Sequence, residues 1–132
     1  MRGALPPIAA VISFIDCINR NDVAGLERLM SADHELVVFD EAPVRGRSAN
    51  IAAWRGYIGA FPDYIIYPSR IAERGGLVAV LGYTTGSHLG LSDDEERKMA
   101  LIWAAEVAEG LLSNWHLHDD SLKNRRRFYL DA

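Results

Sequence analysis

The chain has 132 residues, of which 49% are apolar and 24% are charged, and its formal net charge is −4. The length predicts one domain spanning residues 1–132, and the composition excludes a disordered chain. The negative charge gives no support to nucleic-acid binding, which needs a clustered basic surface. No apolar run approaches the roughly 20 residues that a membrane span needs, so neither nucleic acid nor membrane is an expected partner.

Two helices are expected at the start of the chain. Apolar residues recur with helical spacing from Ile8 to Ile18, and Pro7 suits a first turn, which predicts a helix over residues 7–19. Asn21 or Asp22 can cap a second helix that extends to Met30.

The single cysteine, Cys17, lies in the apolar stripe of the first predicted helix. We interpret it as a small core residue rather than a nucleophile. One cysteine cannot form an internal disulfide, so a reducing cytoplasm is the expected location.

The chain then changes from helix to strand. A short strand is expected at residues 35–39, and a third helix at about 49–60, capped by Ser48 and stopped by Pro62. Strands are expected at residues 64–73, 77–88, 98–108 and 111–119. Pro68 indicates an edge position or a bulge in the first of these four strands.

This order predicts an α+β fold, with three N-terminal helices packed in a strongly curved antiparallel β-sheet. Such a sheet, wrapped around a helix like a cone or barrel, leaves a concave mouth. Small-molecule sites form preferentially in concave places, so an internal pocket is expected.

The last predicted strand carries the densest set of reactive side chains. Because side chains alternate along a strand, Trp115 and Asp119 should share one face, and His116 and His118 the other. A two-residue turn at 109–110 would place Trp103 opposite His116, on the histidine face, unless a bulge shifts the register. The two histidines could bind a metal, but no third ligand has a diagnostic spacing, so we expect no metal and assign their face to a covered surface or a dimer contact.

Several motifs occur in a characteristic order: Phe61-Pro62-Asp63, then Gly86-Ser87-His88-Leu89-Gly90, then Glu109-Gly110, and finally Trp115 followed four residues later by Asp119. In this order they resemble the nuclear transport factor 2-like superfamily, most closely its SnoaL-like polyketide cyclase and ketosteroid isomerase branch, over residues 7–121. The resemblance implies a cone-shaped sheet around the helices, an internal pocket and usually a homodimer. It also implies that Asp119 is an acid/base and that Trp115 faces the cavity. The tyrosine and second acid of the isomerase branch have no residue-level match here.

Asp119 and His88 are the expected catalytic residues. Partial burial beside Trp115 would raise the pKa of the Asp119 carboxyl group, as a general acid/base requires. The alternative is that Asp119 or Asp120 caps the C-terminal helix or pairs with an arginine in the basic run 125–127. His88 could bond a ligand oxygen, although its flanking glycines are equally consistent with a bent strand and a solvent-exposed side chain.

Five aromatic residues could line the pocket, although aromatic residues at such spacing also form plain cores. They are Phe14, Trp54, Tyr57, Tyr83 and Trp115. The expected function is therefore a cofactor-independent lyase, isomerase or cyclase that acts on a small, largely apolar carbonyl compound. The alternative is a non-catalytic small-molecule-binding or dimerisation module of the same fold.

Overall fold

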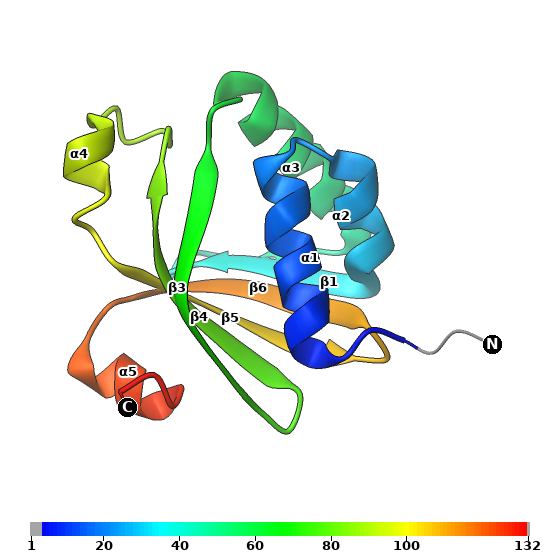
Figure 1. Ribbon diagram of the computed structural model, residues 1–132. Helices are drawn as coiled ribbons and strands as arrows, with labels where there is room; N and C mark the ends of the chain where they lie inside the picture. The colour runs from blue at the N-terminus through cyan, green and yellow to red at the C-terminus, as the bar shows by residue number, and fades with distance from the viewer. Residues whose placement is uncertain (1–3, 132) are drawn as a thin grey trace.

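The computed structural model describes residues 4–131, in which five helices pack around a curved six-stranded sheet (Figure 1). Along the chain the elements are α1 (Pro7–Asn19), α2 (Val23–Leu29), β1 (Met30–Val38), β2 (Val44–Arg45), α3 (Arg47–Ala60), β3 (Ile65–Arg74), β4 (Leu77–Thr85), α4 (Asp93–Glu96), β5 (Leu101–Ala108), β6 (Leu111–Asp119) and α5 (Leu122–Arg127).

The first two helices follow the sequence pattern closely. Pro7 is the first residue of α1. Proline lacks a backbone N–H, and this costs nothing here because the first N–H groups of a helix have no partner within the helix. Asp22 caps α2, because its carboxylate accepts a hydrogen bond of 2.9 Å from the N–H of Gly25. The prediction for Met30 was wrong. It was expected in the second helix, but its backbone is extended and it begins β1.

The strand order across the sheet is β2-β1-β6-β5-β4-β3. All neighbours are antiparallel except β1 and β6, which are parallel. The expected antiparallel sheet is therefore a mixed sheet. The two edge strands, β2 and β3, are not paired with each other, so the sheet is open and does not form the expected barrel.

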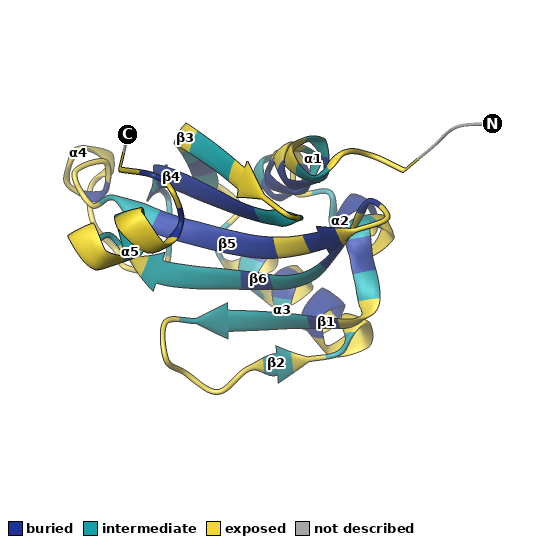
Figure 2. Cartoon of the chain, turned by 90° about the horizontal axis from the view of Figure 1, so that it is seen from below, coloured by how far each residue is buried: buried dark blue, intermediate teal, exposed yellow. Residues whose placement is uncertain are grey.

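The strand expected at residues 35–39, between the second and third helices, is longer than predicted because β1 begins at Met30, and the unexpected strand β2 follows it before α3. α1, α2 and α3 lie on one side of the sheet, called here the inner face, and α5 lies on the other, the outer face (Figure 1). The main core fills the inner face, whereas a smaller cluster lies under the C-terminal segment. Figure 2 shows the molecule from this side, with the buried lengths of β4 and β5 in dark blue. That outer cluster comprises Ala79, Leu81, Ile102, Ala104, Phe128 and Leu130.

The described sheet has three register shifts, and those in β3 and in the β5–β6 hairpin bear on expected residues. β3 is an edge strand whose register shifts between Pro68 and Arg70, as the proline indicated. The β5–β6 hairpin turns at residues 109–110 as expected, but an extra residue in β6 shifts the register between Ala104 and Val107. Trp103 therefore lies opposite Leu117 on the inner face, which corrects its expected place on the histidine face.

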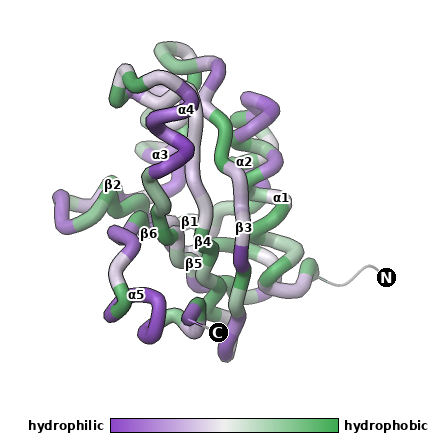
Figure 3. Tube along the Cα trace, turned by 60° about the vertical axis from the view of Figure 1, so that its left-hand side comes forward, coloured by the Kyte–Doolittle hydropathy of each residue, from purple (hydrophilic) through white to green (hydrophobic). Residues whose placement is uncertain are grey.

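The segment after β4 connects to β5 through the short helix α4. Ser92 and Glu95 form a capping box at its start, and Figure 3 shows the hydrophilic character of this helix. Before it, Gly86 has a φ of +72°, and a Cβ there would collide with the backbone carbonyl of Asp63. This glycine lets the α3–β3 loop approach the end of β4.

Candidate functional site

A cavity of about 220 Å³ lies between α3 and the inner face of the sheet. Its walls are mainly aromatic and aliphatic, and they include all three tryptophans of the chain. The lining residues are Leu36, Val38, Ala53, Trp54, Tyr57, Tyr64, His88, Trp103, Trp115 and Leu117. We call this cavity the inner pocket.

The aromatic walls support one another through ring–ring contacts. Trp54 and Tyr57 meet at a centroid distance of 6.3 Å, and Phe14 packs behind the wall at 4.8 Å from Trp115. Phe14 is completely buried and does not line the pocket itself. The expected ligand contact of Phe14 stays a prediction, and its position behind the pocket wall gives it no support.

The polar end of the pocket is a pair formed by Tyr57 from α3 and His88 from the turn after β4. The Tyr57 hydroxyl lies 2.9 Å from His88 Nδ1, and the backbone N–H of His88 donates to the same hydroxyl oxygen at 3.2 Å. His88 is exposed, so the pair stands where the pocket opens to solvent.

Burial raises the pKa of Tyr57, an effect that the hydrogen bond from His88 only partly offsets, so the phenol is protonated near neutral pH. Two arrangements of the protons satisfy the pair. If Tyr57 donates to Nδ1, the Nε2–H of His88 is free to donate. If Nδ1–H donates to Tyr57, the hydroxyl proton is free and Nε2 is a free base. The second arrangement combines a hydrogen-bond donor and a proton acceptor.

Glu96 of α4 anchors the turn that carries His88. It is 1% exposed, and its carboxylate accepts hydrogen bonds from the Thr84 hydroxyl and, at 3.3 Å, from the N–H of Ser87. The sequence did not single it out, because it sits in a run of acidic residues in which its neighbours are exposed. Tyr64 and Trp103 were also not predicted as pocket residues. The direction of the Tyr64 side chain depends on the loop before β3, and that of Trp103 depends on the bulge in β6.

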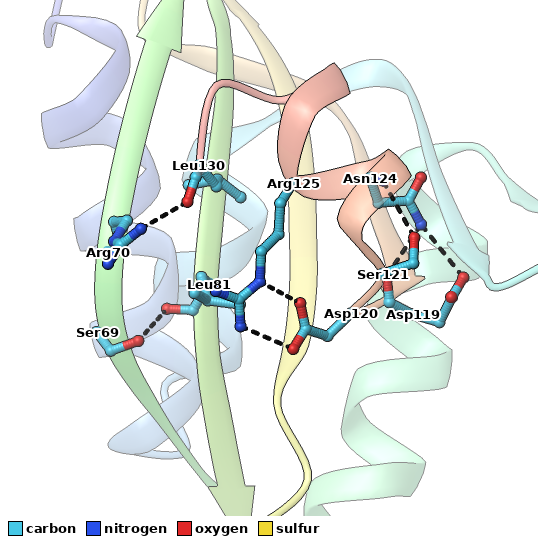
Figure 4. A network of polar contacts seen from close by, with 9 residues as sticks. All are labelled: Ser69, Arg70, Leu81, Asp119, Asp120, Ser121, Asn124, Arg125 and Leu130. Atoms are coloured by element: carbon cyan, nitrogen blue, oxygen red, sulfur yellow. Dashed lines mark hydrogen bonds and ion pairs between the residues drawn. The ribbon is translucent and has the colours of Figure 1, made fainter. Parts of the chain in front are cut away.

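Asp119, the expected acid/base, does not line the inner pocket. It ends β6 as an exposed residue, and the side-chain amide of Asn124 donates to its backbone carbonyl at 2.9 Å and to its carboxylate at 3.2 Å (Figure 4). The neighbouring Asp120 forms a two-pronged ion pair with Arg125, at 2.6 and 2.9 Å, which lowers the pKa of Asp120. Catalysis by Asp119 stays a prediction, and its surface position gives it no support.

Tyr83 also lies away from the inner pocket. Its ring stacks on Tyr67 with centroids 4.9 Å apart. Along β4, Val78 and Val80 belong to the inner core and Ala79 and Leu81 to the outer cluster, so alternation places Tyr83 on the outer face.

His116 and His118 point to the outer face, as expected, and their rings stack at 3.9 Å. No third His, Cys, Asp or Glu joins them in a possible metal site within residues 4–131. Over the same range, no helix has the length and apolar character needed to cross a membrane. The dimer contact expected at this face stays a prediction.

Residues 11–115 match the sequence profile of the SnoaL-like domain. The chain belongs to the SnoaL-like family. This confirms the resemblance identified from the motif order, and no protein of curated function matches the sequence.

Solved structures support the same fold for this SnoaL-like chain. An NTF2-like protein of unknown function from Cytophaga hutchinsonii has a TM-score of 0.71 at 12% identity, covering 98% of this chain and 99% of that one. A putative polyketide cyclase from Sinorhizobium meliloti has a TM-score of 0.69 at 21% identity, covering 86% and 95%. A putative ketosteroid isomerase from Kribbella flavida has a TM-score of 0.69 at 20% identity, covering 87% and 78%. At these identities the matches show the fold alone.

Proposed function

We propose that this SnoaL-like chain binds a small, largely apolar carbonyl compound in the inner pocket and catalyses cofactor-independent proton transfer on it. The observation that carries the proposal is the Tyr57–His88 pair at one end of an otherwise aromatic and aliphatic cavity. The apolar walls favour a ligand with a flat apolar body, and the single polar end favours a ligand with one oxygen atom to bind there. The putative polyketide cyclase and ketosteroid isomerase among the structural matches are consistent with this class of chemistry.

The proposed step is enolisation. The Tyr57 hydroxyl donates a hydrogen bond to the carbonyl oxygen, and Nε2 of His88 takes a proton from the adjacent carbon. The electron pair of the broken C–H bond moves into the enolate, whose oxygen the protonated Tyr57 stabilises. Return of the proton from Nε2 to another carbon completes an isomerisation. In a ring closure, the enolate carbon instead bonds to a second carbonyl carbon of the same compound, whose C=O electron pair moves onto oxygen, and that alkoxide takes the proton from Nε2. In this proposal Asp119 has no direct contact with the reacting atoms.

Acetophenone is a suitable probe because it is a neutral, flat ketone with exchangeable methyl protons. All three tryptophans line the inner pocket, so quenching of their fluorescence reports binding directly. Catalysis is measured separately, as exchange of the methyl protons for deuterium in D₂O by NMR.

We expect Tyr57→Phe to weaken acetophenone binding by about threefold to tenfold, since it removes one buried hydrogen bond. His88→Gln should preserve quenching but slow deuterium exchange at least about a hundredfold, as expected for loss of a general base. Asp119→Asn is the matched control and should change neither quantity. If Asp119→Asn abolishes exchange while the Tyr57 and His88 variants retain it, the acid/base belongs to Asp119 and the proposal is wrong.

A second candidate function is a non-catalytic small-molecule-binding module. It is favoured by one observation: the described lining of the inner pocket contains no aspartate or glutamate. This function predicts saturable quenching by acetophenone with deuterium exchange no faster than in buffer, for the wild-type chain and every variant.

A further inference from the structure

A hollow larger than the inner pocket lies on the outer face of the sheet. It is a groove of about 570 Å³ between β4, β5 and β6 on one side and the segment after α5 on the other. Leu77 and Ala104 contribute apolar surface, and Phe128 and Tyr129 contribute aromatic rings. We call it the outer groove.

Two arginines of the outer groove lie over aromatic rings. The guanidinium carbon of Arg74 lies 4.0 Å from the centroid of Tyr129, and that of Arg127 lies 4.8 Å from the centroid of Phe128. A guanidinium group held over a ring by a cation–π contact still has N–H donors available for a carboxylate. Within residues 4–131, neither arginine forms an ion pair with an acidic side chain.

Two other side chains of the outer groove each have one hydrogen-bonding atom without a partner among the described residues. Asn114 accepts a hydrogen bond from the N–H of Glu106 through Oδ1 at 2.8 Å, while its Nδ2 donor has no partner in the described part of the chain. His116 donates from Nε2 to the Phe39 carbonyl at 3.0 Å, and its Nδ1 has no hydrogen-bond partner among residues 4–131. The groove thus presents guanidinium, amide and imidazole groups beside flat apolar surface.

We infer that the outer groove is a second binding site, which takes a small organic anion with a flat, apolar body. Arg74 and Arg127 bind the anionic group, and Phe128, Leu77 and Ala104 contact the body. The carboxylate of Glu106 also lines the groove, so two arginines and one glutamate leave a single net positive charge. That balance favours a monoanion, such as an aromatic carboxylate, over a multiply charged phosphate.

Titration with sodium benzoate at constant ionic strength tests this inference. The readout is the NMR signals of the His116 and His118 rings, which lie in the outer groove and not in the inner pocket. We expect saturable shifts with benzoate and none with benzamide, which has the same shape without the charge. Absence of saturable shifts with benzoate, or equal shifts with both compounds, would overturn the inference.

Substitutions of opposite charge sharpen the test. Arg74→Gln and Arg127→Gln, on different elements, should each weaken benzoate binding about tenfold, because each removes charged hydrogen bonds. Glu106→Gln should strengthen binding, since it removes a like charge. Arg45→Gln is the control, because this exposed arginine lies on β2 outside the groove, and it should have no effect. Unchanged affinity in both Arg74→Gln and Arg127→Gln contradicts the site even if benzoate binds elsewhere.

Discussion

Glu96 is a buried acidic residue that holds the turn before His88 in place. A carboxylate that is 1% exposed is costly unless it is hydrogen-bonded, and here it joins α4 to the end of β4 and to the turn before His88. We expect Glu96→Ala to lower the free energy of unfolding by about 3 kcal/mol, because it leaves the Thr84 hydroxyl and the Ser87 N–H without their acceptor. Urea denaturation measures this change.

The neighbouring Glu95 is a matched control, because it has the same chemistry but is exposed. Glu95→Ala loses only the capping box and should cost about 1 kcal/mol. Equal losses for the two substitutions would show that Glu96 has no anchoring role.

At the scale of elements, the burial of His118 in β6 makes the stability of the sheet depend on pH. Burial, and then the charges of His116 and Arg127, lower the pKa of His118 from 6.5 to about 4, against a smaller raising effect of Asp119. The folded state therefore binds fewer protons than the unfolded state between these values. Stability should be full above about pH 6.5 and fall as the pH drops toward 4, by an amount on the order of 1–3 kcal/mol after allowing for solvent screening.

The expected fall is measured by urea denaturation at pH 7 and pH 5. His34, whose pKa is also lowered by burial, contributes in the same direction, so the wild-type chain alone does not isolate His118. His118→Gln does, because glutamine is uncharged at both pH values, and the variant should lose less stability than the wild type on acidification. An identical loss in both proteins would refute the role of His118.

The whole molecule depends on the contact between α1 and the inner face of the sheet. Phe14 is completely buried there, between Trp54, Trp115 and His34. Phe14→Ala should lower the free energy of unfolding by about 3–5 kcal/mol through lost burial and a cavity. Ile12→Ala, on the same helix at a position 49% exposed, should change it by less than about 0.5 kcal/mol. Denaturant unfolding compares the two, and similar effects would contradict this packing.

The sequence by itself determined the elements whose signals are local. The helical spacing and Pro7 predicted α1 with its observed bounds, Asp22 was one of two predicted caps for α2, and Pro68 indicated the bulged edge strand β3. The motif order was sufficient to identify the SnoaL-like family. Within the site, the sequence named Trp54, Tyr57, His88 and Trp115, because aromatic and imidazole side chains are recognisable by type.

Only the tertiary structure decided how these residues meet. The parallel pairing of β1 with β6 is a long-range contact that no local pattern specifies. The extra residue in β6 reverses the face on which a side chain lies, so it brought Trp103 to the inner pocket, while Asp119 ended in a surface contact with Asn124. Glu96 and its exposed acidic neighbours look alike in sequence, since burial is a property of the packed chain. For these residues the sequence shows the chemical type of the side chain, whereas its position in the folded molecule depends on long-range pairing and packing.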